Sequence, residues 1–461
     1  MSGSSRLSTI MSEEYVEEYE FIEGVEDLSM YRPGGYHPVA IGDSFCDGRY
    51  EVVTKLGHGG YSMIWLGRDH QLNRYVAIKI PIAQVENDAE LKITRRLTSL
   101  LRQDPEGKRF VSVLLDHFTL IGPNGSHRCL VLEPARINLG KAKDKSPVSY
   151  ELYFQPETCR AIMGQVIQAV AVLHDVGVVH GDLHAGNVLF HLPEVIDNLS
   201  IEEFYERFHK PYSRKVIRSD GQEIKASAPE SVVFSAWFGV GPEKLKVEET
   251  ELFLCDFGES YLPAEIERYQ SNTLMTNAPP EARFSDNPMS FPSDMWTLGC
   301  NLFQIMGCGP MFRSFFQEED AITRQHVDTC GKLPLDWWEK WDARSQFFDD
   351  DCNPISESNE CDTFEERFER GMQFHRRRLG MELVSDEERD DFLDMLKRVI
   401  VLDPAQRLTI HELMQTRWFH RWIQPALEKV RQAKASVVAA GPTDTTEIAQ
   451  RKEDLTESSE D

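Results

Sequence analysis

The 461-residue chain has no run approaching the roughly 20 apolar residues of a membrane-spanning helix, so no contact with a membrane is expected. Residues 1–18 lack an apolar core after a basic start, which argues against a secretory signal. Ser2 rather than glycine follows the first methionine, which argues against N-myristoylation. These absences favour a location in the cytosol, the nucleus or both.

The chain is also poor in the features of metal-binding and nucleic-acid-binding proteins. Its nine cysteines form no Cys-x-x-Cys pair and have no metal-ligand spacing, so they are predicted to be reduced thiols. The net charge of -26 would repel nucleic-acid phosphates, so no direct nucleic-acid partner is expected. The acidic charge suits a partner rich in arginine or lysine, or it simply aids solubility.

The remaining composition, 41% hydrophobic and 27% charged, is that of a globular protein long enough for two lobes. Acidic, aliphatic-poor stretches at 1–28 and 431–461 are predicted to be disordered tails. Between them we expect an α+β fold. Its first lobe, 29–133, has strand-like patterns and one main helix. Its second lobe, 134–430, is mostly helical, with a polar insert at about 191–250.

The first motif is a glycine-rich turn between two predicted strands, Gly57-His58-Gly59-Gly60-Tyr61-Ser62. Glycine lets the backbone turn tightly and approach a phosphate without a Cβ in the way. One strand later comes Lys79, in the apolar run Val76-Ala77-Ile78-Lys79, where an unpaired ammonium is costly to bury. Glu90, on the following helix, is its expected partner in an ion pair that holds nucleotide phosphates.

The second cluster is His180-Gly181-Asp182-Leu183-His184-Ala185-Gly186-Asn187, directly after an apolar run. Asp182 is the candidate acceptor of a substrate hydroxyl proton, and Asn187 the candidate ligand of a Mg²⁺ ion. Further along, Asp256 in Leu254-Cys255-Asp256-Phe257-Gly258 is the second candidate Mg²⁺ ligand. Each motif alone arises easily by chance, whereas all of them in this order indicate phosphoryl transfer from ATP.

A third group follows, with Ala278-Pro279-Pro280-Glu281, Asp294-x-Trp296-x-x-Gly299 and Asp403-Pro404-x-x-Arg407. With it, the chain resembles eukaryotic protein kinases. The resemblance implies a bilobal fold, with ATP and Mg²⁺ between a β-rich N-lobe and a helical C-lobe. It also implies that Glu281 pairs with Arg407 and that Asp294 anchors the catalytic loop. The positions implied for nucleotide binding are the glycines Gly57, Gly59 and Gly60, the hinge residues Glu133 and Ala135, and Ala77 and Leu189 around the adenine.

The first lobe resembles one kinase family more narrowly. The chain is similar to the beginning of the kinase domain of SR-protein kinases, and specifically to a divergent fungal-type member. The similar segments are Tyr31-Arg32-Pro33-Gly34-Gly35-Tyr36-His37-Pro38, Ile41-Gly42-Asp43 and Gly59-Gly60-Tyr61-Ser62-x-x-Trp65-Leu66. This likeness implies a serine/threonine kinase that acts on protein substrates rich in Arg and Ser. Separately, the chain is expected to be a monomer. The acidic stretches 317–320 and 349–366 are candidates for docking them.

Three positions depart from the kinase pattern. Gly181 replaces the arginine that reads a phosphorylated activation loop, which favours constitutive or partner-set activity. His184 stands where a lysine usually contacts the γ-phosphate, and a neutral imidazole supplies one hydrogen bond but no charge. The segment 273–277 places no threonine in the usual register before Glu281. Slow catalysis is therefore expected.

Two alternatives to a protein kinase remain at this point. The catalytic-loop pattern also resembles that of aminoglycoside and choline kinases, which phosphorylate small molecules but lack the three segments of the third group. A non-catalytic pseudokinase that binds nucleotide or a partner is the other alternative. Against it, every residue needed for metal-assisted transfer is present, namely Lys79, Glu90, Asp182, Asn187 and Asp256.

Overall fold

The computed structural model describes residues 18–84, 89–144, 153–192, 194–238, 244–314, 318–355 and 362–440. The chain divides into two compact units. The first unit comprises residues up to Arg95, Val113–Arg136 and Leu192–Phe238, and the second comprises Arg96–Ser112, Ile137–His191 and the residues from Gly239 onward.

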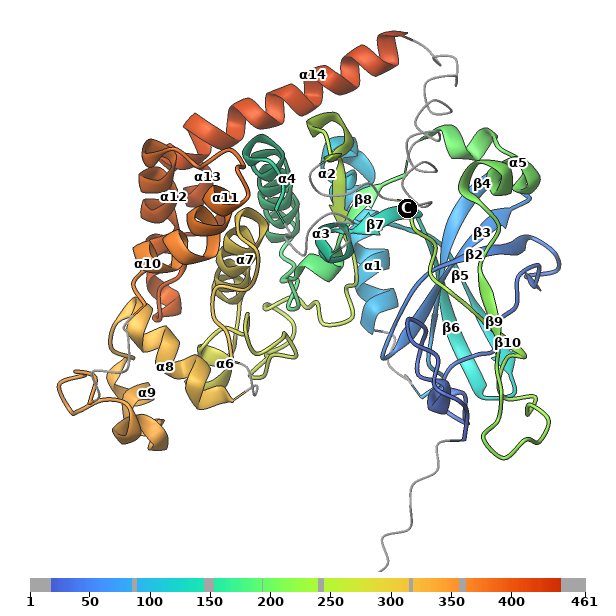
Figure 1. The fold of residues 1–461 in the computed structure, drawn as a ribbon, viewed down its shortest axis with the longest axis horizontal. Helices are drawn as coiled ribbons and strands as arrows, with labels where there is room; N and C mark the ends of the chain where they lie inside the picture. Colours follow the sequence, from blue (N-terminus) through green and yellow to red (C-terminus); the bar gives the residue numbers. More distant parts are fainter. Residues whose placement is uncertain are drawn as a thin grey trace, which may run out of the picture. The chain divides into compact units, whose positions relative to one another are not determined.

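A six-stranded antiparallel sheet forms the first unit (Figure 1), with strand order β1-β2-β3-β4-β6-β5. The strands are β1 (Ser44–Phe45), β2 (Tyr50–Gly59), β3 (Ser62–Asp69), β4 (Arg74–Pro81), β5 (Leu114–Gly122) and β6 (Gly125–Leu132). β-Branched and aromatic side chains fill the central strands and are buried on the sheet, which is the composition that favours strands. Helix α1 (Ala89–Leu100) starts in this unit and confirms the expected main helix.

The structure corrects the expectation that the whole insert at 191–250 belongs to the second lobe. Only His191 and the part from Gly239 onward do, while the main part, residues 192–238, folds with the first unit. It contains α5 (Ile201–Phe208), β9 (Ser213–Lys215) and β10 (Ser231–Val233). A reciprocal capping box between Ser200 and Glu203 starts α5. Phe204 of α5 then packs on Tyr75 of β4, with ring centroids 5.2 Å apart. The sequence of the insert is mainly polar because only a few of its side chains are buried.

The segment 18–28 is also part of the first unit, which corrects the predicted disordered tail at 1–28; residues 1–17 lie outside the described chain. Tyr19, Ile22 and Leu28 are buried in one core with Val216 and Val232 of the insert. The backbone N–H of Glu20 donates to the carbonyl of Ile217 at 2.9 Å. Burial of these apolar residues depends on a partner segment about 200 residues away, so the local acidic composition was misleading.

The second unit is mainly helical and confirms the expected pattern after Pro134. Its helices are α2 (Pro105–Lys108), α3 (Leu139–Asp144), α4 (Pro156–Asp175), α6 (Glu281–Phe284), α7 (Phe291–Met306), α8 (Glu319–Cys330), α9 (Leu335–Lys340), α10 (Phe364–Phe368), α11 (Phe374–Arg378), α12 (Asp386–Val399), α13 (Ile410–Met414) and α14 (Gln424–Ala440). α4 and α7 are buried on nearly all sides and form its core. α14 continues to Ala440, so the predicted tail at 431–461 begins too early; residues 441–461 lie outside the described chain.

Two short strands of the second unit, β8 (Val188–His191) and β11 (Leu252–Leu254), pair antiparallel. The register places Val188 opposite Leu254. Strand β7 (Ala135–Asn138) carries the chain from one unit to the other. The β8–β11 pair matters for the site, because it brings the residues just before β8 next to those just after β11.

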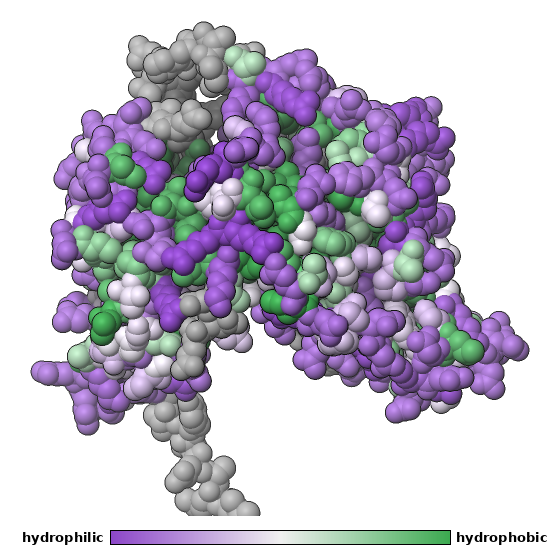
Figure 2. All heavy atoms as spheres, turned by 180° about the vertical axis from the view of Figure 1, so that it is seen from behind, coloured by the Kyte–Doolittle hydropathy of each residue, from purple (hydrophilic) through white to green (hydrophobic). Residues whose placement is uncertain are grey.

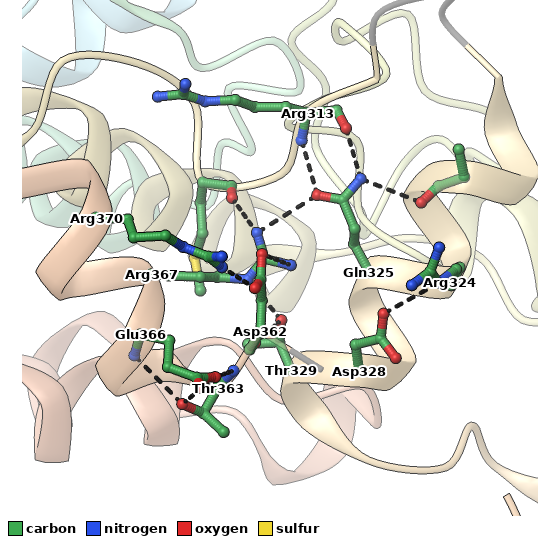
Figure 3. A network of polar contacts seen from close by, with 12 residues as sticks. Arg313, Arg324, Gln325, Asp328, Thr329, Asp362, Thr363, Glu366, Arg367 and Arg370 are labelled. Carbon is green, nitrogen blue, oxygen red and sulfur yellow. Dashed lines mark hydrogen bonds and ion pairs between the residues drawn. The ribbon is translucent and has the colours of Figure 1, made fainter. Parts of the chain in front are cut away.

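A buried arginine joins α8 to α10 (Figure 3). Arg367 donates from Nε to Oγ1 of Thr329 at 2.7 Å and from Nη1 to the carbonyl of Met311 at 2.8 Å. Its guanidinium also lies over the ring of Phe312, 5.1 Å from the centroid. Burial lowers the pKa of Arg367 to about 10, a value at which it stays charged at neutral pH.

The outer surface agrees with the charged composition. Figure 2 shows hydrophilic side chains over most of the face it presents, with hydrophobic residues in smaller patches. In the part of the chain that the structure describes, no helix has the length and apolar character required to cross a bilayer.

Two neighbouring histidines make the first unit sensitive to acid. The rings of His37 and His127 are buried and lie 5.1 Å apart. Burial and the charge of His127 lower the pKa of His37 to about 4, and burial also lowers the pKa of His127. The unfolded chain protonates His37 near pH 6.5 and the folded chain only near pH 4, so stability should fall as the pH drops through this window.

We expect the protonation of His37 to remove on the order of 3 kcal/mol of unfolding free energy over that window. His37→Phe keeps a ring in the site but cannot be protonated, so its stability should depend less on pH than that of the wild type. Urea unfolding across the window measures this difference. Parallel curves for the two proteins would show that His37 does not cause the acid sensitivity.

Candidate active site

The glycine-rich turn lies at the tips of β2 and β3, where Gly59 is opposite Ser62. A Cβ added to Gly59 or Gly60 would have no atom within 4 Å, so the space beside both residues is open. On the adjacent strand β4, Nζ of Lys79 lies 2.6 Å from Oε1 of Glu90 on α1. The expected ion pair is therefore formed, and both side chains are largely buried.

The predicted adenine-binding residues of the first unit lie beside this ion pair in the sheet. Ala77 is on β4 and pairs with Leu132, the last residue of β6. Glu133 and Ala135 follow directly, and both are half-buried. The next residue, Arg136, donates from Nε to the carbonyl of Phe238 at 2.6 Å, so the end of the insert lies against this part of the chain. Leu189, the remaining predicted residue, belongs to β8 of the second unit.

A buried carboxylate fixes the catalytic loop of the second unit. Asp294, in the first turn of α7, accepts the backbone N–H of His180 at 2.7 Å and that of Gly181 at 3.0 Å. Burial alone would raise the pKa of Asp294, but the hydrogen bond and charge of His174 hold it below its usual value. The ionised carboxylate thus fixes the Val179–His180 and His180–Gly181 peptides, which lead into Asp182.

His180 reinforces the loop from within. It is fully buried, and burial lowers its pKa, so the ring is neutral. Its Nδ1 accepts the backbone N–H of Asp182 at 3.3 Å, and its Nε2 donates to the carbonyl of Cys255 at 3.2 Å. One neutral imidazole therefore joins the loop that carries Asp182 to the segment that carries Asp256.

The two predicted metal ligands lie at one end of the β8–β11 pair. Asn187 directly precedes β8, and Asp256 comes two residues after the end of β11 at Leu254. Between them, the N–H of Cys255 donates to the carbonyl of Asn187 at 3.0 Å. The side-chain nitrogen of Asn187 donates to the carbonyl of Asp182 at 3.0 Å, which leaves Oδ1 as its acceptor oxygen. Oxygen ligands of this kind, completed by phosphate and water, suit Mg²⁺. The residues present therefore fit the metal.

Asp256 has the left-handed backbone conformation, with φ of 63°. Such strain in a non-glycine residue persists only where the surroundings enforce it, and it is concentrated at functional sites. Phe257, the next residue, is buried with its ring 5.7 Å from that of His180. The buried ring of Phe257 thus fixes the chain directly after the left-handed backbone of Asp256.

His184 lies beside the candidate base. Its Nδ1 accepts the backbone N–H of Gly186 at 3.0 Å, which requires a lone pair there and places the proton on Nε2. That Nε2 lies 3.5 Å from Oδ2 of Asp182. In this geometry His184 is a neutral neighbour of the carboxylate, and it does not supply the charge of the lysine usual at this position.

Gly181 occupies a position that no other residue can take without a backbone shift. Its φ is +78°, and a Cβ would lie 2.5 Å from the carbonyl oxygen of Glu259. The close approach brings the loop against the segment that follows Asp256. There, Val179 and Tyr261 exchange backbone hydrogen bonds at 2.9 and 3.1 Å, and Oγ of Ser260 donates to the carbonyl of His180 at 2.7 Å.

Three further residues support the loop and were not found from the sequence. Oγ1 of Thr273 donates to the carbonyl of Gly181 at 3.1 Å, although its register before Glu281 is not the usual one. Asn301 on α7 donates to the carbonyl of Leu183 at 2.8 Å. His174 on α4 lies 3.1 Å from Asp294. Of these three residues, only Asn301 could have been suspected from the sequence. It lies two helical turns after Asp294 on α7 and therefore on the same face of that helix.

The expected ion pair between Glu281 and Arg407 closes the second unit. It is bidentate, with both N···O distances 2.7 Å, and both side chains are buried. Oγ of Ser293 also donates to Glu281 at 2.8 Å, and the guanidinium lies 5.0 Å from the ring centroid of Trp296. This pair links the segment after Asp256 to α7 and to the loop before α13.

The comparison with known families matches the description "Protein kinase domain" to residues 50–202 and 244–419. Among the similar proteins, serine/threonine-protein kinase spk-1 of Caenorhabditis elegans is 40% identical over 49% of this chain and 22% of its own length. SRSF protein kinase 3 of Homo sapiens is 34% identical over 44% of this chain and 36% of its own. The chain thus spans well under half of these two relatives.

Two matches cover more of the chain. A serine/threonine protein kinase of Aspergillus fumigatus is 24% identical over 85% of this chain and 90% of its own length. A solved kinase-domain structure superimposes with a TM-score of 0.56 at 17% identity, covering 83% of this chain and 98% of that one. At this identity the structural match supports the fold alone.

The contact between Gly181 and Glu259 can be tested with two alanine substitutions. Gly177→Ala and Gly181→Ala both place a side chain at positive φ, at a cost of about 1–2 kcal/mol each. No atom lies within 4 Å of the Cβ position at Gly177, whereas the Cβ at Gly181 meets a backbone oxygen. Gly181→Ala should therefore lower the unfolding free energy by at least about 1 kcal/mol more than Gly177→Ala.

Urea unfolding of the two variants measures this difference. Equal losses would show that the backbone around Gly181 moves freely and that the close contact has no structural importance.

Proposed function

Because the chain belongs to the protein kinase family, we propose that it transfers the γ-phosphoryl group of ATP to serine or threonine hydroxyls of proteins. The observation that carries the proposal is the fixed backbone on both sides of Asp182. Asp294 holds the peptides before it, and Asn187 binds its carbonyl oxygen. A carboxylate held in this way is ready to accept a proton without reorganisation.

Each residue of the site has a chemical task in this proposal. The glycine turn cradles the phosphates, and Lys79, oriented by Glu90, neutralises their charge. Asn187 and Asp256 would hold Mg²⁺, which would supply positive charge to neutralise the phosphate oxygens. Asp182 accepts the proton as the substrate hydroxyl oxygen attacks the γ-phosphorus and the bond to the β–γ bridging oxygen breaks. Catalysis thus comes mainly from positioning and charge neutralisation.

We further propose that arginine- and serine-rich proteins are the substrates. The support is the likeness to a kinase named for SRSF proteins and the net charge of -26. Of the two acidic stretches considered for docking, Glu319 and Asp320 pair with Arg283, which compensates part of their charge. Residues 349–351 are exposed and remain the better candidate, while residues 356–361 lie outside the described chain.

The contacts of Gly181 support activity without activation-loop phosphorylation. Backbone contacts and the hydroxyl of Ser260 already hold the segment 259–261 on the catalytic loop. At Gly181 there is no side chain to bind a phosphate on that segment. We therefore propose that the kinase is active as synthesised, at a rate limited by the missing charge at His184.

The role of Asp182 is tested with Asp182→Asn, which retains the shape of the side chain and both backbone contacts of the residue. Transfer from labelled ATP-Mg²⁺ to an Arg/Ser repeat peptide should fall about 10²- to 10⁴-fold, because the amide cannot accept the proton. Affinity for ATP should change little. Asp175→Asn, a carboxylate removed from the surface end of α4, is the matched control and should leave transfer intact.

The outcomes separate the alternatives. An equal loss of ATP binding in Asp182→Asn would contradict the assignment of Asp182 as base. Choline and an aminoglycoside are offered in parallel, and transfer to either of them but not to the peptide would establish a small-molecule kinase. A wild-type protein that binds ATP but transfers to none of them would be a pseudokinase.

A further inference from the structure

An N-terminal segment of the first unit, residues 26–36, lies against the glycine turn, and we call it the strap. One of its anchors is a buried ion pair between Glu26 and Lys55, both of whose side chains are almost inaccessible to solvent. Lys55 lies on β2, two residues before Gly57. The hydroxyl of Tyr31 donates to Oε1 of Glu26 at 2.5 Å and lies 3.4 Å from Sδ of Met63 on β3. The strap is thus anchored to both strands that form the turn.

The last residue of the strap contacts the turn itself. The hydroxyl of Tyr36 donates to the carbonyl oxygen of Gly59 at 2.7 Å. Tyr36 is 3% exposed, and burial raises the pKa of its phenol, so the hydroxyl keeps its proton. The remainder of the residue is held as well. Its N–H donates to the carbonyl of Met30 at 2.9 Å, and its carbonyl accepts Nδ2 of Asn124 at 2.6 Å.

This hydrogen bond determines the orientation of one peptide group. The peptide between Gly59 and Gly60 is planar and trans, so its C=O and N–H point in opposite directions. When Tyr36 holds the carbonyl on the side of the strap, the N–H of Gly60 points to the other side. A glycine–glycine peptide has little intrinsic preference among orientations, so an external contact must supply one.

The N–H of Gly60 is the kind of donor that binds a phosphate oxygen. Backbone N–H groups in glycine-rich turns bind phosphates when they converge on an open space. The space beside Gly59 and Gly60 is open, because a Cβ at either position would meet no atom within 4 Å. The strap therefore fixes the direction of the Gly60 N–H. Because Gly59 and Gly60 have no side chains, space remains beside them for a phosphate oxygen.

We infer that Tyr36 is a positioning residue for the nucleotide phosphates, which acts by holding the Gly59 carbonyl so that the Gly60 N–H is presented to them. The inference rests on the proposed ATP-dependent function and adds a residue from outside the glycine motif to the phosphate site. Tyr36 itself contacts no reacting atom. Its effect should therefore appear in the binding of phosphates and not in the binding of the adenosine moiety.

The test removes a single hydroxyl group. Tyr36→Phe keeps the ring and the backbone contacts of the strap but releases the Gly59 carbonyl. Affinity for the non-hydrolysable analogue AMP-PNP with Mg²⁺, measured by calorimetry, should fall about fivefold to tenfold, the usual worth of one hydrogen bond. Affinity for adenosine, which has no phosphates, should stay unchanged, and the KM for ATP should rise by a similar factor.

Tyr31→Phe is the matched control within the strap. It also removes one buried phenolic hydroxyl, but that hydroxyl contacts Glu26 and Sδ of Met63 and not the Gly59 carbonyl that Tyr36 holds. Tyr31→Phe should lower the melting temperature and leave the affinity for AMP-PNP unchanged. The inference is overturned if Tyr36→Phe binds AMP-PNP like the wild type, if it loses adenosine affinity by the same factor, or if Tyr31→Phe loses as much AMP-PNP affinity.

The wild-type protein separates failure of the inference from failure of the proposed function. If the wild type binds adenosine and AMP-PNP and only the Tyr36→Phe comparison fails, the ATP-dependent function stands and the role of Tyr36 falls. If the wild type binds neither ligand, the proposed function and the inference both fall.

Discussion

The candidate site depends on one buried carboxylate. Asp294 gives up hydration on burial, and this cost is offset by three donors, namely two loop N–H groups and the ring of His174. Because these bonds fix the peptides of His180 and Gly181, the neighbouring Asp182 can be held by Asn187 and His180. Without the carboxylate, the two loop N–H groups would be buried and unpaired. The loop would then no longer present its base and metal ligand in one arrangement.

Other buried charges in the structure follow the same principle. Glu281 with Arg407 and Arg160 with Glu388 form bidentate contacts, and Glu26 with Lys55 forms a pair at almost zero exposure. Such pairs contribute little net stability because desolvation opposes their attraction, but breaking one leaves an uncompensated charge. Their effect is to exclude other arrangements. Each one joins segments that are distant in the sequence.

The sequence predicted the elements whose signals are local. The kinase fold and the likeness to SR-protein kinases are confirmed, because glycine turns, apolar strands and a set of ordered motifs can be recognised one by one. The position of the insert and the order of residues 18–28 could not be predicted. Their few apolar side chains, such as Tyr19 and Val232, become a core only when the two segments meet. Thr273 was missed for a similar reason, because its contact with Gly181 depends on the path of the intervening chain.

The departures from the family pattern become consistent with one another when they are considered together. At Gly181 the missing side chain lets the backbone approach Glu259, and direct contacts replace the charge pairing through which an arginine would sense a phosphate. A catalytic loop held in this way has little freedom left to be switched. The adjustable part of the phosphate site is then the glycine turn, whose open space has no side chains and whose carbonyl is held by Tyr36. The segment that precedes the first long strand anchors this turn, so the geometry of the phosphate site depends on residues outside the glycine motif.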